Sequence, residues 1–296
     1  MYNPQIDTFI NVADAGSFNK AAEKAYISSS AVIKQINLLE DDLGIKLFDR
    51  THRGIVLTNA GKSLYSDAKY IINYCNGTVN RAKNAMRETD NVIRIGTSPM
   101  TPPQFLIELW PQIHNYNPDL KFQFITFENT PENAKEILKN LGQNYDVVAG
   151  IFDDRLLQIR ECAGTVLAKE PLCCAVSINH PQAQKERLTI SDLYGQHLHI
   201  IGRERMDSMD RLRDEIETFH SPISIIDFEF YNTDVFNQCE NSNDILIAIQ
   251  KWENVHPLLK IIPVDWSFSI SFGLLHAREP SEKVLKFIEA IKSTIK

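Results

Sequence analysis

The hydrophobic periodicity of the chain changes near residue 90, and this change limits the folds that the chain can adopt. Before residue 90, apolar side chains recur mostly at helical spacing. After residue 90, short apolar runs typical of strands alternate with helical patterns, which favours an α/β architecture with helices covering a sheet. A chain of 296 residues is long enough for about two domains, so we expect a helical head and an α/β body.

The first 45 residues contain three predicted helices joined by tight connections. The first helical pattern ends at Gly16, and Ser17 can cap the second helix. Ser28 can cap the third helix, and Gly44 can end it in the left-handed conformation. Two short helices, a tight turn and a third helix predict a helix-turn-helix.

The next segment predicts a hairpin and a long helix. Two short apolar runs, 45–48 and 55–57, flank a basic segment with a glycine, which indicates a hairpin with a basic tip, or wing. Thr58 can cap a long polar helix that extends to about residue 88, with a narrow apolar stripe that suits pairing with another helix. We predict that this stripe dimerises the protein through Leu64, Ile71, Cys75 and Val79.

Charge is distributed unevenly along the chain. The net charge is -7, but residues 1–87 carry 11 basic and 8 acidic side chains, whereas residues 88–296 carry 20 and 30. A mildly basic head on an acidic body is expected when only the head meets a polyanion.

Several residues of the head have a characteristic order and spacing. The first run is Phe9-x-x-Val12-Ala13-x-x-Gly16-Ser17-Phe18-x-x-Ala21-Ala22. The second run comprises Ser30, Ala31, Val32, Gln35, Ile36, Leu38, Leu39, Glu40, Leu43, Gly44, Leu47, Phe48, Arg50, Arg53, Leu57, Thr58 and Gly61. In this pattern the head resembles the LysR-type transcriptional regulators.

The resemblance implies an α/β protein with a winged helix-turn-helix, a long linker helix and a two-lobed effector domain of periplasmic-binding-protein type. We expect the DNA-binding domain at 1–58, the dimerising linker helix at 59–89 and the effector-binding domain at 90–296. Within the last domain, lobe 1 should comprise about 90–163 and 267–296, and lobe 2 about 164–266.

The predicted third helix has two faces. The face that should pack against the first two helices carries Val32, Ile36, Leu39 and Leu43. The opposite face should enter the major groove, where Lys34 can donate to guanine acceptors or to phosphate. We expect DNA contacts from Ser28, Ser29, Ser30, Ile33, Lys34 and Asn37, and at the wing from Arg50 and Arg53.

Two positions of this helix depart from the family pattern. Ser29 stands where the family usually has glutamine, and Ile33 where it usually has serine. A long bidentate amide is therefore missing, and an apolar group replaces a hydroxyl. Ile33 either touches a thymine methyl group in the groove or is partly buried, with DNA shape supplying more of the specificity.

The segment after the first predicted strand of the body is rich in hydroxyl groups. Hydroxyls and backbone N–H groups at a helix N-terminus can bind an anion, although Ser98 or Thr101 can also simply cap the helix. The resemblance implies an effector cleft lined by this loop and by other loop ends: Thr97, Ser98, Met100, Thr101, Asn129, Thr130, Phe152, Gly202, Asn232 and Thr233. Arg203, next to Gly202, is a further candidate because of its charge.

Two features of the second lobe leave alternatives open. Arg203 and Arg205 either clamp an anionic effector or pair with acidic neighbours such as Glu204. The family's glycine-rich segment corresponds to 241–248, which has no glycine here. The cleft can therefore be empty or filled by the protein's own side chains.

Motifs of metal, disulfide, redox and enzyme chemistry are missing from the sequence. The five cysteines form no CxxC pair, Cys173 and Cys174 are interpreted as buried strand residues, and His197 and His199 have no third metal ligand nearby. GxGxxG, GxxxxGKS/T, GxSxG and HExxH do not occur. We predict a protein that is not an enzyme and that uses no metal or cofactor.

The chain contains no apolar window of about 18 residues, and its N-terminus lacks the basic and apolar regions of a secretion signal. We therefore predict a soluble, cytoplasmic protein without a membrane partner.

Together these features predict a sequence-specific DNA-binding transcriptional regulator whose C-terminal domain senses a small-molecule effector. The expected partners are double-stranded promoter DNA with an interrupted inverted repeat, the effector, and further copies of the chain as a homodimer or homotetramer, with RNA polymerase as another candidate. Two alternatives remain: a constitutive DNA-binding regulator without an effector, and a ligand-binding module with little role on DNA.

Overall fold

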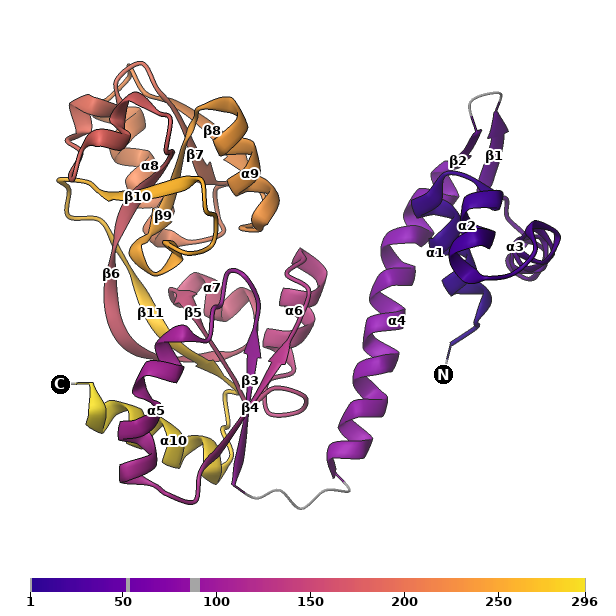
Figure 1. The fold of residues 1–296 in the computed structure, drawn as a ribbon, viewed down its shortest axis with the longest axis horizontal. Coiled ribbons are helices and arrows are strands. Elements are labelled where there is room, and N and C mark those ends of the chain that lie inside the picture. The colour runs from indigo at the N-terminus through magenta and orange to yellow at the C-terminus, as the bar shows by residue number, and fades with distance from the viewer. Residues whose placement is uncertain (1, 52–53, 86–90, 296) are drawn as a thin grey trace. The chain divides into compact units, whose positions relative to one another are not determined.

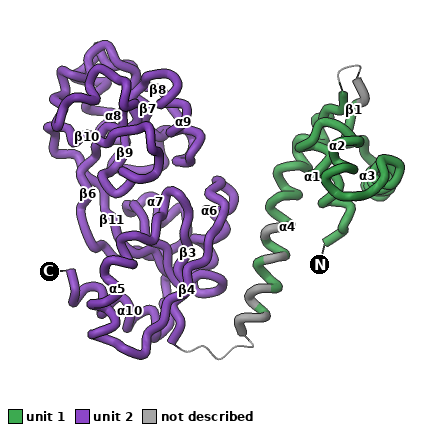
Figure 2. Tube along the Cα trace, in the orientation of Figure 1, with its two compact units in different colours: residues 1–87 green, residues 88–296 purple. Residues whose placement is uncertain are grey.

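The computed structural model in Figure 1 describes residues 2–51, 54–85 and 91–295. The chain divides into two compact units, residues 1–87 and residues 88–296 (Figure 2). No helix within the described ranges is both long and apolar enough to cross a membrane.

The N-terminal unit has the predicted order of helices and hairpin. Its elements are α1 (Gln5–Ala15), α2 (Phe18–Ala25), α3 (Ser29–Leu43), β1 (Phe48–Thr51), β2 (Gly54–Leu57) and α4 (Asn59–Ala85). Gly16 and Gly44 end α1 and α3 at φ of 61° and 68°, a left-handed conformation that costs glycine little. The caps read from the sequence therefore lie within a residue of the observed helix ends.

A buried carboxylate joins the hairpin to α3. Glu40 accepts hydrogen bonds from the backbone N–H groups of Leu47 (2.8 Å) and Phe48 (3.3 Å), and the Lys46 ammonium lies 2.6 Å from it. Burial alone would raise the pKa of Glu40, but these hydrogen bonds outweigh burial and hold the pKa below its ordinary value. Glu40 thereby fixes β1 against α3.

Close backbone contact joins α4 to the same place. Thr58 accepts from the N–H of Gly61 and donates its hydroxyl to the carbonyl of Lys46. A Cβ atom at Gly61 would lie 2.1 Å from the carbonyl oxygen of Leu47, so only glycine fits here without movement of the backbone.

The C-terminal unit contains, within the described residues, one nine-stranded sheet in the order β4-β3-β5-β11-β6-β9-β7-β8, with β10 beside β6. Lobe 1 consists of β3 (Val92–Thr97), α5 (Gln104–Tyr116), β4 (Lys121–Thr126), α6 (Pro131–Lys139), β5 (Val147–Phe152), α7 (Asp154–Ile159), β11 (Ser269–His276) and α10 (Glu282–Thr294). Lobe 2 consists of β7 (His197–Ile201), α8 (Asp207–Phe219), β8 (Ser224–Phe228), α9 (Thr233–Ser242), β9 (Ile245–Ile249) and β10 (Leu259–Pro263), with short 3₁₀ helices at Pro181–Gln184, Ile190–Leu193 and Gln250–Trp252.

Two strands connect the lobes. The first part of β6 (Ala163–Ser177) pairs with β11, and its last part pairs with β9 and β10. Figure 1 shows β6 and β11 running between the two lobes. The register shifts at Gly273, where a Cβ atom would lie 2.0 Å from the Thr165 carbonyl oxygen. This irregular pairing lies within the sheet of lobe 1, because Gly273 also pairs with Gly150 of β5.

A buried ion cluster holds lobe 1 together. Asp146, which is 1% exposed, lies 2.7 Å from the Arg94 guanidinium and 2.8 Å from the Lys283 ammonium. It also accepts the backbone N–H of Arg94 at 2.8 Å. The cluster links β3, the start of β5 and α10.

Candidate DNA-binding surface and effector cavity

The face of α3 opposite the core is the candidate DNA-binding surface. Val32, Ile36 and Leu39 are buried as predicted. Leu43 was also expected in the core, but it is 46% exposed because it lies in the last turn, beyond the buried positions. The solvent-facing positions are Ser28, Ser30, Lys34 and Asn37, all exposed, and Ile33, which is half-buried.

The three serines at the start of α3 have different partners. The Ser28 hydroxyl accepts the N–H of Ala31 and so caps the helix, and it lies 3.0 Å from the Ser30 hydroxyl. The Ser29 hydroxyl instead donates to Asn19 of α2 at 2.8 Å. Ser29 therefore ties α2 to α3, whereas Ser28 and Ser30 remain at the exposed N-terminus of the helix.

An exposed aromatic residue beside this N-terminus was not predicted. Tyr26 ends α2 in the left-handed conformation at φ 55°, and its side chain is 95% exposed. Only the tight connection at this point was readable from the sequence. Of the predicted wing contacts, Arg53 lies outside the described residues, and for Arg50 only the backbone, in β1 opposite Ile55, is described.

The predicted dimerisation stripe lies on α4. Ile71 and Val79 are 37% and 39% exposed, Cys75 is half-buried, and Leu64 packs partly against the core of the N-terminal unit. The C-terminal part of the stripe, from Ile71 to Val79, therefore presents apolar side chains to solvent.

The C-terminal unit contains a cavity of about 420 Å³ that both lobes line. Lobe 1 contributes residues from α6, β5, α7 and the end of the loop before α5; lobe 2 contributes residues around 201–206, 229–231 and Trp252. Three of the predicted effector residues line the cavity: Met100, Thr101 and Asn129.

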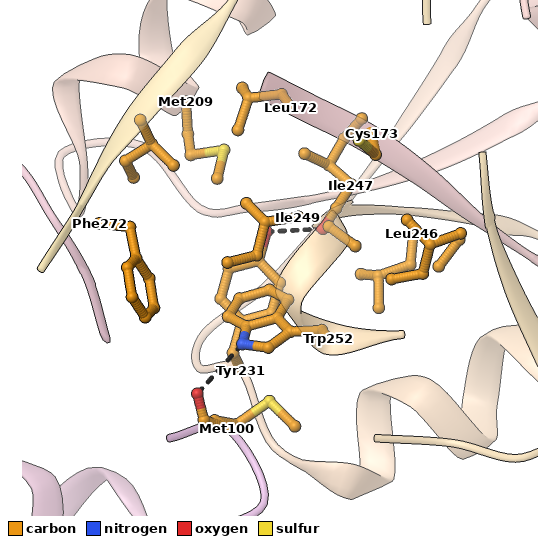
Figure 3. Packing of buried hydrophobic residues seen from close by; sticks show 14 of the residues in the cluster. Met100, Leu172, Cys173, Met209, Tyr231, Leu246, Ile247, Ile249, Trp252 and Phe272 are labelled. Atoms are coloured by element: carbon orange, nitrogen blue, oxygen red, sulfur yellow. Dashed lines mark hydrogen bonds between the residues drawn. The ribbon is translucent and has the colours of Figure 1, made fainter. Parts of the chain in front are cut away.

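Trp252 and Tyr231 of lobe 2 lie beside Met100, which belongs to the loop between β3 and α5 (Figure 3). Trp252, which is 4% exposed, donates its indole N–H to the Met100 carbonyl at 3.0 Å. Tyr231 packs beside Trp252 at a ring distance of 4.7 Å. Asn129 donates to the Tyr231 carbonyl at 2.8 Å. Asn129 and Met100, two residues predicted to contact the effector, thus form hydrogen bonds between the lobes instead.

Two hydroxyl groups of the loop between β3 and α5 contact each other. Thr97 and Ser98 are buried, and the hydroxyl groups of Ser98 and Thr101 lie 2.9 Å apart. Neither Thr97 nor Ser98 is among the residues that line the cavity. Trp252, far away in sequence, was missed because no local pattern indicates that it crosses to the other lobe.

The remaining predicted effector residues also lie outside the cavity lining. Thr130 and Asn232 cap α6 and α9 by accepting the N–H groups of Asn133 and Val235. Phe152 is buried, Gly202 donates its N–H to the Phe228 carbonyl, and Thr233 is the exposed first residue of α9. Arg203 pairs with Asp214 (2.8 Å) and Glu217 (2.5 Å), so of the two alternatives for this arginine the structure has the pairing with acidic residues.

The family assignment follows from comparison with known proteins. Residues 4–62 match the family described as "Bacterial regulatory helix-turn-helix protein, lysR family". Residues 87–296 match the "LysR substrate binding domain". The chain belongs to the LysR family. This is a family of transcription regulators rather than of enzymes.

Curated LysR relatives are moderately similar. A "Hydrogen peroxide-inducible genes activator" from Pectobacterium carotovorum subsp. carotovorum is 25% identical over 205 residues, covering 65% of this chain and 62% of the relative. The "HTH-type transcriptional regulator TfdT" from Cupriavidus pinatubonensis is 37% identical over 91 residues, covering 31% of this chain and 40% of the relative. The matches thus span less than two thirds of the length of these relatives.

Solved structures of LysR proteins share the fold. The crystal structure of CbnR, a LysR family transcriptional regulator, has a TM-score of 0.58 at 19% identity and covers 100% of both chains. Full-length CbnR complexed with its target DNA has a TM-score of 0.56 at 18% identity, covering 99% of this chain and 100% of CbnR.

The cysteines and histidines considered as redox or metal candidates are either buried or close to Asp244. Burial raises the pKa of the Cys173 thiol to about 11 and also raises that of Cys174. His199 lies 3.0 Å and His197 3.4 Å from Asp244. Among the residues that the structure describes, no three His, Cys, Asp or Glu side chains are grouped so that they could hold a metal.

Proposed function

We propose that this LysR-family chain is a sequence-specific DNA-binding transcriptional regulator whose C-terminal unit binds a small-molecule effector. The observation that carries the proposal is the exposed face of α3, where Lys34 and Asn37 face solvent while Val32 and Ile36 hold the helix in the core. A helix presented in this way can enter the major groove of DNA. The bacterial regulatory helix-turn-helix family matched by residues 4–62 supports the same function.

The mechanism that we propose is linkage between effector and DNA. The exposed stripe of α4 pairs two chains, so that two recognition helices meet half-sites about 34 Å apart, or a multiple of that distance, on an interrupted inverted repeat. An effector that prefers one arrangement of the lobes shifts the dimer or tetramer geometry and so its fit to the promoter. This division assigns 1–58 to DNA binding, 59–89 to dimerisation and 90–296 to the effector, in a protein that acts in the cytoplasm and recruits or excludes RNA polymerase.

Footprinting tests this function directly. The purified protein is placed on the DNA upstream of its own gene, at a stated salt concentration, with and without pools of candidate metabolites. We expect a protected inverted repeat whose pattern changes with one pool. Protection that no pool alters supports the constitutive alternative, and absence of specific binding in a genome-wide survey contradicts the proposal.

The Lys34→Ala variant tests the recognition helix. Loss of a base contact costs about 1–3 kcal/mol, so we expect operator affinity to fall by roughly five- to 150-fold. Fluorescence anisotropy on the operator and on a scrambled duplex measures the change, with Lys292→Ala in α10 as a charge-matched control. Equal losses on both duplexes, or a loss only on the scrambled duplex, would contradict a role in sequence recognition.

A peroxide response through the buried cysteines, which the names of some relatives bring into consideration, is not favoured. The thiolate is the reactive form of cysteine, and burial raises the pKa of Cys162 and Cys173 to about 11 and of Cys239 to about 12. We expect the footprint to be unchanged by dilute hydrogen peroxide. A peroxide-dependent footprint that disappears in a Cys173→Ala, Cys174→Ala double variant would show that the buried pair is a sensor.

A further inference from the structure

The cavity of the C-terminal unit has an apolar body. Its walls come mainly from α6, β5 and α7, with Trp252 and Met206 from lobe 2. The apolar lining residues are Met100, Phe127, Ala134, Ile137, Leu138, Val148, Ile151, Leu156, Ile159, Ile201, Met206, Trp252 and Leu275. A volume of about 420 Å³ lies within the range of small-molecule sites, which is roughly 300–1,000 Å³.

Two arginines, Arg160 and Arg205, line the same cavity. Arg160 ends α7 in lobe 1, and Arg205 follows β7 in lobe 2. Across the described residues, neither guanidinium has an ion pair or a hydrogen bond, although Glu132 and Glu229 also line the cavity. Arg160 is half-buried, whereas Arg205 is exposed. The other half-buried or buried arginines of this unit differ from Arg160, since Arg94, Arg155 and Arg213 all pair with aspartates.

The surroundings of Arg160 are unfavourable for a cation. Burial, and next the positive charge of Arg205, lower the pKa of Arg160. Two guanidinium groups that line one cavity, one of them partly desolvated, are stabilised by an anion between them. A carboxylate suits this position, because it can accept several charge-assisted hydrogen bonds from arginine.

We propose that this cavity binds an organic anion with an apolar aliphatic or aromatic body, and that Arg160 and Arg205 together hold its anionic group. The inference rests on the proposed effector function and names the chemical class of the effector. The anionic group then contacts the two arginines and not Thr97 and Ser98, which do not line the cavity. Because the two arginines belong to different lobes, the bound anion bridges the lobes beside the Trp252–Met100 and Asn129–Tyr231 hydrogen bonds.

Two matched pairs of probes separate the anionic group from the apolar body. Octanoate is compared with octanamide, and 3-phenylpropionate with 3-phenylpropionamide, in calorimetric titrations of the full-length protein. Arg160→Gln and Arg205→Gln remove one guanidinium each. Ala134→Leu narrows the apolar part, and Arg211→Gln, an exposed arginine on α8, is the charge-matched control.

We expect at least one carboxylate to bind more tightly than its amide, with the dissociation constant raised about tenfold or more by either arginine substitution. Ala134→Leu should weaken carboxylate and amide alike, and Arg211→Gln should change neither. If each amide binds as well as its carboxylate, if neither carboxylate binds, or if Ser98→Ala weakens binding while the two arginine variants do not, the proposal is wrong.

Operator footprinting of the same variants separates this proposal from the function on which it rests. Arg160→Gln and Arg205→Gln should still protect the operator in the absence of ligand. Loss of anion binding with intact protection concerns only the cavity, whereas a wild-type protein that protects no operator contradicts the regulator function itself.

Discussion

Replacement of Asp146 by asparagine should destabilise the C-terminal unit by about 3–5 kcal/mol, the usual cost of breaking a buried ion pair. The variant keeps the shape of the side chain but leaves the Arg94 and Lys283 cations without their counter-ion. Urea denaturation followed by circular dichroism measures the free energy of unfolding. Asp119→Asn, at an exposed turn, is the control and should change stability little.

The pH dependence identifies the charge as the cause. Burial by itself would raise the pKa of Asp146, but hydrogen bonds from Arg94 and Lys283 outweigh it and lower the pKa in the folded protein. A lowered folded pKa adds stability above the unfolded pKa of about 3.9, and this stability is lost as the pH falls through the folded pKa. The difference between wild type and Asp146→Asn should therefore be full at pH 7 and shrink below about pH 4. A difference that does not shrink would mean that shape, not charge, is responsible.

Replacement of Gly61 by alanine should disrupt the N-terminal unit. The new Cβ atom would lie 2.1 Å from the Leu47 carbonyl oxygen and 3.0 Å from a Leu57 methyl group, so the start of α4 must move away from the hairpin. Overpacking typically costs about 1–3 kcal/mol, and contact with a backbone atom places this variant at the upper end. Thermal unfolding and operator affinity should both decrease.

Ser63→Ala, at an exposed position of the same helix, is the control for Gly61→Ala and should leave both quantities unchanged. If Gly61→Ala lowered operator affinity without any loss of stability, Gly61 would instead contribute to DNA contact. If neither quantity changed, the close approach of α4 to Leu47 would not be required.

The helices of the head could be predicted because their ends depend on local residues. Ser28 caps α3 and Gly44 ends it, and both signals lie next to the helix that they bound. The strands of the C-terminal unit were harder to predict from the sequence. The first part of β6 contains Gly164 and Pro171, two residue types that are unfavourable within strands, yet pairing with β11 keeps it extended. β9 and β10 likewise pair with β6, a partner that is distant in the sequence.

The candidate effector site was only partly predictable for the same reason. Sequence order correctly located a loop between β3 and α5, but it could not show that Trp252 would bond to the Met100 carbonyl or that Ser98 and Thr101 would face each other. Part of the cavity wall instead comes from side chains of α6 and α7, where no sequence pattern indicated a ligand. Arg205 was noticed for its charge, whereas Arg160 has no sequence signal that separates it from other surface arginines.

The connection through β6 and β11 has a consequence for synthesis of the protein on the ribosome. Lobe 1 begins with β3, but its sheet is completed by β11, which inserts between β5 and β6. All of lobe 2 is translated between these two parts, so β5 waits without its neighbour while lobe 2 emerges. During this interval the nascent chain exposes a strand edge, which is a site for incorrect pairing and for chaperone binding. Ribosome-bound chains ending near residue 266 should therefore be more sensitive to protease in lobe 1 than the complete chain after its release.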